Sequence, residues 1–354
     1  NDIGNEYVPI GPNDVIFNEY TGDTKSLGGV FHANDWLSFT YNTASNVDVP
    51  DNDARVVPGT FPDAGEGEGE DFGVILNLLE GKMVVRALRY ETSQRKITAA
   101  FGTPGQVYNR SERVLDGLLD QGFITDAENA AHRLGDRVNR LYLDKDSVGY
   151  EFTVTANVTE NWSFNLNYSK TDKEQSNVGD AVKEWASAES AFWVQALGGM
   201  DPNTVFVEDG GNSIQEEVDD LNFWISDSLR PGATKGLRPH KFNVFTNYNF
   251  RDGLLKGFSV GGGYRWLSEN LMGWLPSNGR NIWGEAYGTA DLMFRYRTKL
   301  SDKYHLSVQL NIQNVLDEDE YLPGAFNGND PNRGLRQIYL REPIDYQLTT
   351  TISF

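Results

Sequence analysis

The sequence has no cysteine and only four histidines in its 354 residues. The absence of cysteine excludes disulfide bonds and thiolate zinc sites, and four histidines leave little material for a histidine metal cluster. Basic residues are also scarce, since 31 Lys and Arg stand against 51 Asp and Glu for a formal net charge of −20. Binding to nucleic acid requires clustered positive charge. We therefore expect no metal, no cofactor and no nucleic-acid partner.

Signs of catalysis and of membrane helices are missing too. The four histidines, at positions 32, 132, 240 and 305, are far apart, and no Ser/His/Asp order or His-x-x-x-His spacing surrounds them. We expect no catalytic residue and no enzymatic activity. No run approaches the roughly 18 consecutive apolar residues of a transmembrane helix. That absence leaves open a membrane-spanning β-barrel, whose short alternating strands carry a much weaker hydropathy signal.

What the sequence does contain is alternation of apolar and polar residues with a period of two, which predicts β-strands with one apolar face. The final nine residues show it most clearly. Their apolar face would consist of Tyr346, Leu348, Thr350, Ile352 and Phe354. About eleven strands follow from this pattern, at residues 26–32, 36–42, 72–79, 83–94, 150–158, 162–169, 241–250, 256–266, 287–300, 304–314 and 346–354.

The connections between these strands alternate between short turns and long loops. Soluble β-proteins rarely hold several structureless loops longer than about 15 residues, whereas bacterial transmembrane barrels combine short periplasmic turns with long extracellular loops. The pattern therefore predicts an all-β, antiparallel transmembrane β-barrel. Helical spacing indicates short helices within residues 112–141 and 180–199, and the acidic stretch GEGEGED is expected in a solvated loop. The long loops are 43–70, 97–146, 174–236, 270–283 and 317–342.

Several stretches carry a family resemblance. They are GEGEDFGVILNLLEGKMVVRALRYETSQ, HANDWLSFTYN, NIQNVLDEDEY and LREPIDYQLTTTISF. Taken together with the loop pattern, the chain resembles the C-terminal half of the barrel of a TonB-dependent outer-membrane receptor. The barrels of such receptors have 22 strands and a plugged lumen. Strand parity matches the eleven strands of this chain to strands twelve to twenty-two, so residues 1–354 are expected to be one barrel domain without the plug and the first strands.

The resemblance implies a location in the outer membrane of a Gram-negative-type bacterium and a role in active import. The receptor would bind a scarce nutrient, of the siderophore, cobalamin or oligosaccharide class, and would take energy from TonB. The implied partners are outer-membrane lipid, the TonB complex acting through the plug, the N-terminal half of the receptor, the barrel-assembly machinery that reads the last strand, and a possible surface lipoprotein. A passive porin-type channel and a soluble β-rich module remain as alternatives.

Four charged residues are candidates for the interior of the barrel: Arg265, Asp291, Arg295 and Arg297. They fit either pairing with one another or with a plug, or direct contact with a substrate. Three tryptophans are candidates for stacking on a ligand, because an aromatic ring brings a large contact area with few rotatable bonds. The alternative explanation is packing within a loop or in an aromatic belt, and for the third tryptophan it is helix packing. They are Trp274, Trp283 and Trp224.

Overall fold

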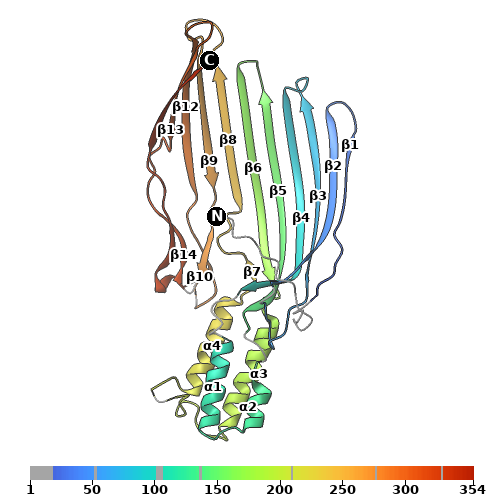
Figure 1. Ribbon diagram of the computed structural model, residues 1–354, viewed down its shortest axis with the longest axis vertical. Helices are drawn as coiled ribbons and strands as arrows, with labels where there is room; N and C mark the ends of the chain where they lie inside the picture. Colours follow the sequence, from blue (N-terminus) through green and yellow to red (C-terminus); the bar gives the residue numbers. More distant parts are fainter. Residues whose placement is uncertain are drawn as a thin grey trace.

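The computed structural model describes residues 19–354, apart from residues 52–53, 101–106, 135–137, 209, 276 and 328–329. Eleven strands form one antiparallel sheet in the order of the chain (Figure 1), so the prediction of about eleven strands is confirmed. The strands are β1 (Lys25–His32), β2 (Leu37–Asp48), β3 (Gly65–Leu78), β4 (Met83–Ala100), β5 (Arg140–Asn157), β6 (Trp162–Ser176), β8 (His240–Asn249), β9 (Phe258–Leu267), β12 (Tyr287–Lys299), β13 (His305–Gln313) and β16 (Asp345–Ser353), with the short β7 (Gly232–Ala233) beside β6.

The register keeps one apolar and one polar face continuous across this sheet. Leu348 of β16 lies opposite Leu310 of β13, which in turn lies opposite Phe294 of β12. On the other face, Gln347 lies opposite Asn311. Since side chains alternate along a strand, a slip by one residue would exchange the two faces. We call the apolar face the outer face and the polar face the inner face.

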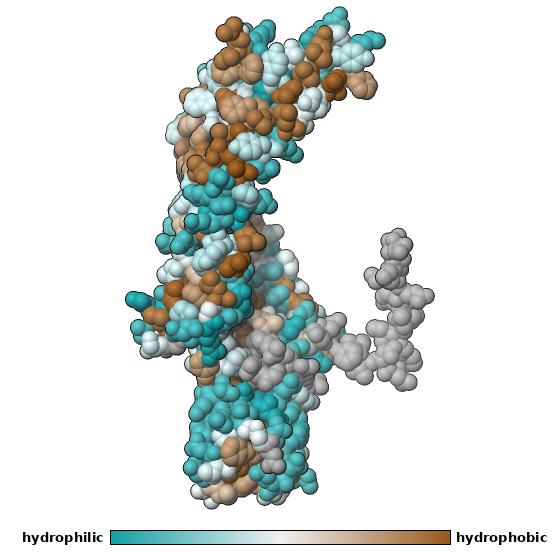
Figure 2. Space-filling view, turned by 90° about the vertical axis from the view of Figure 1, so that its left-hand side faces the viewer, coloured by the Kyte–Doolittle hydropathy of each residue, from teal (hydrophilic) through white to brown (hydrophobic). Residues whose placement is uncertain are grey.

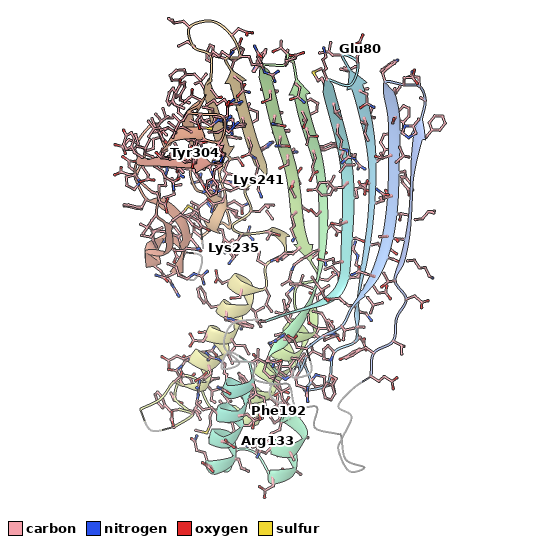
Figure 3. The ribbon with its side chains drawn as sticks, turned by 45° about the horizontal axis from the view of Figure 1, so that its top comes forward. Glu80, Arg133, Phe192, Lys235, Lys241 and Tyr304 are labelled. Carbon is pink, nitrogen blue, oxygen red and sulfur yellow. The ribbon has the colours of Figure 1, made fainter. Side chains whose placement is uncertain are left out.

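The two ends of the sheet differ in their connections. We call one end the turn end, where Glu80 lies in the turn between β3 and β4 (Figure 3), and the other the loop end. All the helices lie at the loop end (Figure 1). The alternation of short turns and long loops is as predicted. The connections at the turn end are residues 33–36, 79–82, 158–161, 250–257 and 300–304.

Several strands extend further toward the loop end than the sequence indicated, and one prediction there is wrong. The stretch GEGEGED, expected in a loop, lies within β3, which begins at Gly65. Its glutamates alternate with glycines, so Glu66, Glu68 and Glu70 face outward, whereas the glycines between them and Asp71 face inward. A Cβ atom at Gly67 would lie 2.3 Å from Oδ1 of Asn46. The glycines therefore leave space for polar side chains of the neighbouring strand.

Two loops together build a helical bundle at the loop end (Figure 1). The loop between β4 and β5 contributes α1 (Tyr108–Asp120) and α2 (Asp126–His132), and the loop between β6 and β8 contributes α3 (Asp180–Ala196) and α4 (Ile214–Ser228). Helices are thus present in both predicted stretches, although the first is divided in two and ends before residue 141, which belongs to β5. Helix α4 was missed.

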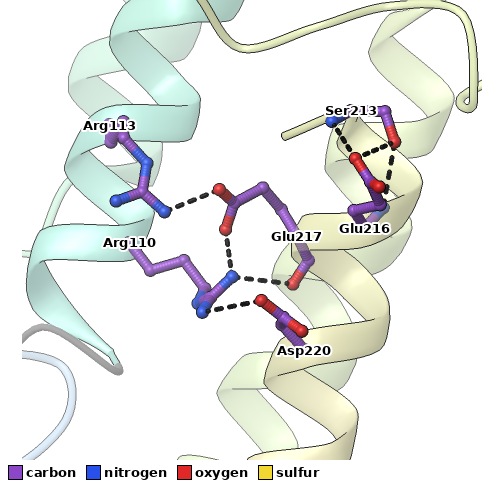
Figure 4. A network of polar contacts seen from close by, with 6 residues as sticks. All are labelled: Arg110, Arg113, Ser213, Glu216, Glu217 and Asp220. Carbon is purple, nitrogen blue, oxygen red and sulfur yellow. Dashed lines mark hydrogen bonds and ion pairs between the residues drawn. The ribbon is translucent and has the colours of Figure 1, made fainter. Parts of the chain in front are cut away.

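The bundle has a hydrophobic core of its own, with Trp193 fully buried among residues of α1, α3 and α4. A buried ion-pair network crosses the same contact (Figure 4). Glu217 of α4 accepts hydrogen bonds from Arg113, at 2.6 Å, and from Arg110 on α1. Both oxygens of the buried carboxylate are thereby paired, which offsets part of the cost of burying it.

Two small hairpins lie in the loops between β9 and β12 and between β13 and β16. They are formed by β10 (Leu271–Trp274) with β11 (Asn281–Trp283), and by β14 (Leu322–Phe326) with β15 (Leu335–Tyr339). A short 3-10 helix spans Pro331–Arg333.

The sheet is open. Within the described residues β1 and β16 each pair on one side only, so the eleven strands do not close into a barrel by themselves. Hydrophobic residues gather over the sheet, and the helical end is mainly hydrophilic (Figure 2). No helix in the described part of the chain is both long and apolar enough to cross a membrane.

Candidate functional site

On the inner face cations outnumber carboxylates, although the chain as a whole is strongly acidic; the inward-facing carboxylates are Asp48, Asp71, Glu151, Asp291 and Asp345. Strand register assigns its residues, because every partner of an inner-face residue also faces inward. A cationic inner wall beside an acidic exterior favours the entry of anions. The inward-facing cations include Arg86, Lys173, Lys241, Arg265, Arg295 and Arg297.

The four predicted charged residues divide into two groups. Arg265 of β9 forms an ion pair of 2.9 Å with Asp291 of β12. Pairing of these charged residues with one another was one of the alternatives expected from the sequence. Arg295 and Arg297 lie further along β12 toward the turn end, and Arg295 contacts the Asn249 amide oxygen at 3.5 Å instead of a carboxylate. Only Arg265 and Asp291 therefore reach the loop-end part of the inner face.

The Arg265–Asp291 pair lies at one side of a cavity of about 210 Å³. The final loop supplies the other side, including Tyr339 and Arg341. Asn314 connects the two, because its backbone N–H donates to Asp291 at 3.0 Å and its side chain donates to Glu342 O at 2.9 Å. The predicted pair thus helps to hold the final loop over the inner face.

Two arginines contact the ring of Tyr287 in this region. The guanidinium carbon of Arg238 is 4.8 Å from the centre of the Tyr287 ring, and that of Arg341 is 5.6 Å away. Arg238 is buried and donates to Glu285 O at 2.7 Å. Burial lowers the pKa of Arg238, but an arginine stays charged in proteins. Arg341 pairs with Glu318 at 2.5 Å.

Trp274 forms the centre of a second group of cations. The Arg230 guanidinium carbon lies 4.8 Å and the Lys235 Nζ atom 5.1 Å from a ring centre of Trp274. Lys235 lies where the sheet meets the helices (Figure 3). Arg230 also donates to Gly279 O at 2.6 Å. These contacts orient an aromatic ring and two cations along a small cavity of about 100 Å³.

The other predicted tryptophans are separate from this group. Trp283 is on β11, where it lies opposite Leu271 and is 45% exposed. Trp224 packs from α4 against both hydrophobic clusters of the helical bundle. A role of either residue in ligand binding stays a prediction.

The structure adds residues that the sequence reading missed. Three of them come from the stretch RPGATKGLRPH, which holds three cations and no acidic residue in a chain of net charge −20. That local reversal of charge was the available signal. Together with Trp274 and Tyr287 we call these residues the mouth site, whose cations are Arg230, Lys235, Arg238 and Arg341.

Comparison with known proteins supports the fold. The catecholate siderophore receptor Fiu of Escherichia coli K12 is 23% identical over 261 residues, which are 74% of this chain and 26% of the relative. The chain therefore aligns with about a quarter of that relative's length. No family model matches the chain.

Solved structures of two outer-membrane receptors have a similar fold. The pyoverdine receptor FpvA of Pseudomonas aeruginosa matches with a TM-score of 0.56 at 16% identity, over 93% of this chain and 35% of the receptor. BauA, the ferric preacinetobactin receptor of Acinetobacter baumannii, matches with a TM-score of 0.55 at 11% identity, over 94% of this chain and 36% of the receptor. The resemblance to a TonB-dependent receptor barrel and the outer-membrane location are thereby confirmed.

Proposed function

Because this chain has the fold of part of a TonB-dependent receptor barrel, we propose that it belongs to an outer-membrane uptake receptor whose mouth site binds an anionic, aromatic iron chelate. The proposal takes its substrate class from the mouth site and its mode of action from proteins of similar sequence or fold, one named a catecholate siderophore receptor and one a ferric preacinetobactin receptor. Energy from TonB and a plug that fills the lumen belong to the proposal. A passive channel is the alternative.

The observation that carries the proposal is the pairing of cations with aromatic rings at the loop end of the inner face. Arg230 and Lys235 are both placed on Trp274, and Arg238 and Arg341 are both placed on Tyr287. Cationic side chains give no electrostatic preference for a neutral sugar. A ferric tris-catecholate complex, in contrast, is a trianion with aromatic rings at its surface. Charge-assisted contacts and ring stacking would therefore act on the same ligand.

The test compares two iron complexes that differ in charge. We expect the receptor in detergent to bind a trianionic ferric tris-catecholate at least about tenfold more tightly than a neutral ferric tris-hydroxamate, and to lose that preference as salt is raised. The double variant Arg230→Ala/Lys235→Ala should weaken binding of the trianion by roughly tenfold to a hundredfold, because it removes two charged contacts. Equal affinity for the two complexes would reject the anionic chelate.

A matched control carries the same change in charge elsewhere. In Lys183→Ala/Lys256→Ala one lysine is lost from α3 and one from the turn end, and we expect unchanged affinity. Uptake of labelled iron by iron-starved cells separates the receptor from the passive channel. Uptake that persists after the proton-motive force is collapsed would contradict the active receptor.

A further inference from the structure

A tyrosine ring lies across three strands on the inner face of the sheet. Tyr90 of β4 is in register with Gly149 of β5, which is in register with Thr171 of β6. The Tyr90 hydroxyl lies 2.7 Å from Oγ1 of Thr171, so the ring spans the strand between them. A Cβ atom at Gly149 would lie 2.2 Å from Cζ of Tyr90. The glycine therefore lets the ring lie close against the backbone, and the other face of the ring is turned toward the interior.

Two lysines lie on the same face, further toward the loop end. Lys173 is two residues beyond Thr171 on β6, and Lys145 is four residues before Gly149 on β5. The spacing of strands and residues places the Cα atoms of the two lysines about 8 Å apart. Both lysines are half-buried. The tyrosine ring and two cations thus occupy one area of the inner face.

These two cations are not neutralised by neighbouring carboxylates. Neither Lys145 nor Lys173 forms an ion pair with a residue in the described part of the chain, whereas Lys170, on the other face of β6, pairs with Asp172 at 2.7 Å. Asp48 attracts Lys145 without forming an ion pair, and the repulsion from Lys173 is stronger. An anion placed between the two lysines would relieve that repulsion and gain two charge-assisted contacts.

Hydrogen bonds connect the two lysines to the mouth site. The backbone N–H of Thr234 donates to Lys173 O at 3.1 Å, and Thr234 belongs to the basic stretch RPGATKGLRPH. Gln175, the register partner of Lys145, donates from its side chain to Arg230 O at 3.0 Å. The lysines therefore lie next to the first cation group of the mouth site, and the tyrosine ring lies beyond them in the direction of the turn end.

We propose that Tyr90, Lys145 and Lys173 form a second binding site for an anionic, aromatic ligand, which the chelate reaches from the mouth site. Both sites combine cations with an aromatic ring, so they suit the same chemical class of ligand. The inference rests on the proposed function for that class. Asp71, the register partner of Tyr90 on β3, accepts a hydrogen bond from the Asn42 amide at 3.0 Å.

The experiment counts the ferric tris-catecholate complexes that bind to the intact receptor in detergent, by native mass spectrometry and titration calorimetry. We expect the wild type to bind two complexes. Lys145→Gln/Lys173→Gln should weaken the second binding step by about tenfold or more and leave the first unchanged, because it removes two charged contacts from one site. Tyr90→Leu should weaken the second step by about threefold to tenfold, because the stacking surface is lost.

A matched control changes the same number of charges elsewhere. Lys170→Gln/Lys183→Gln removes one lysine from the outer face of β6 and one from α3, and it should still bind two complexes. Arg230→Ala/Lys235→Ala should weaken the mouth site and retain the second site. If Lys145→Gln/Lys173→Gln does not give the wild-type circular dichroism spectrum, Lys173→Gln alone replaces it, with an expected weakening of about threefold to fivefold.

The possible outcomes separate this inference from the proposed function. A single bound complex, with an affinity that Lys145→Gln/Lys173→Gln leaves unchanged, would overturn the second site and leave the proposed function standing. Loss of both binding steps in that variant would place the lysines in the mouth site and also overturn a separate site. A receptor that binds no ferric tris-catecholate at all would reject the proposed function and the second site together.

Discussion

At the scale of single residues, the helical bundle depends on a buried carboxylate that has two cationic partners. The side chain of Glu217 is 1% exposed, and it joins α4 to Arg110 and Arg113 of α1 (Figure 4). Breaking a buried pair by removing one partner leaves the other charge uncompensated. The α1–α4 contact is therefore sensitive to the loss of any one of these charges.

We predict that Glu217→Ala destabilises the helical bundle by about 3–5 kcal/mol, because Arg110 is then left buried without its main partner. Hydrogen exchange of the α1 and α4 amides in the intact protein measures this change as faster local opening. Glu184→Ala is the matched control, since Glu184 is an exposed glutamate of α3. Its effect should stay within about 0.5 kcal/mol. Similar exchange in both variants would contradict the assigned role.

A second buried carboxylate gives the bundle a dependence on pH. Burial raises the pKa of Glu189, and its contact of 2.9 Å with Nδ1 of His132 opposes the shift. A carboxyl group whose folded-state pKa lies above its unfolded value costs stability where it is ionised. That cost is present at neutral pH and disappears as pH falls through the raised pKa toward the unfolded value.

We therefore predict that Glu189→Gln stabilises the bundle by about 1 kcal/mol at pH 7.5, because the amide keeps an oxygen for His132 and carries no charge. The advantage over the wild type should shrink as pH is lowered toward about 4. Hydrogen exchange of α3, corrected for the intrinsic effect of pH, follows the difference. A variant that is less stable than the wild type at pH 7.5 would show that the hydrogen bond outweighs the burial of charge.

At the scale of elements, the motif NIQNVLDEDEY has a structural role. Asn314, which has a φ of 47° and is 5% exposed, donates from its amide to Glu318 O at 3.1 Å and to Glu342 O at 2.9 Å. Asp317 accepts from the Ile344 backbone N–H at 2.9 Å. The motif thus ties the beginning of the final loop to its return into β16.

We predict that Asn314→Ala loosens residues 317–342 and lowers the affinity of the mouth site for its anion by roughly tenfold. Two hydrogen bonds are lost and alanine must adopt a left-handed backbone, at a combined cost of about 2–4 kcal/mol. Faster hydrogen exchange in β14 and β15 is the direct readout. Asn332→Ala serves as the control, because Asn332 is exposed and hydrogen-bonds to Asp330 within its own loop. Unchanged exchange in Asn314→Ala would contradict the bracing role.

At the scale of the whole molecule, the two faces and the two ends of the sheet differ in the residues that they carry. The outer face is apolar toward the turn end and acidic toward the loop end, where the glutamates of GEGEGED point outward. The inner face is polar, and cations outnumber carboxylates on it. The unpaired sides of β1 and β16 expose backbone groups that cannot face lipid without partners. We therefore expect further strands, from the N-terminal half of the receptor, to complete the barrel, and this expectation remains a prediction.

Part of this architecture could be predicted from local patterns. Strand number, the two faces and the alternation of turns with loops all follow from a period of two, which needs no knowledge of distant contacts. The sequence analysis missed one strand segment and one helix, because their local signal is not an alternation of apolar and polar residues. In GEGEGED, charged and small residues alternate instead of polar and apolar ones. For α4, the local signal was the capping box formed by Ser213 and Glu216 at its N-terminus.

What the sequence by itself determined was therefore the sheet and its orientation of side chains, because alternation is a property of neighbouring residues. Only the tertiary structure decided which charges meet. Arg265 and Asp291 come together because β9 pairs with β12, whereas Arg295 falls on the same strand but nearer the other end. The two groups of the mouth site, Arg230 and Lys235 at Trp274 and Arg238 and Arg341 at Tyr287, each combine residues from loops that are far apart in the sequence. Such convergence depends on strand order and loop closure, which no local pattern encodes.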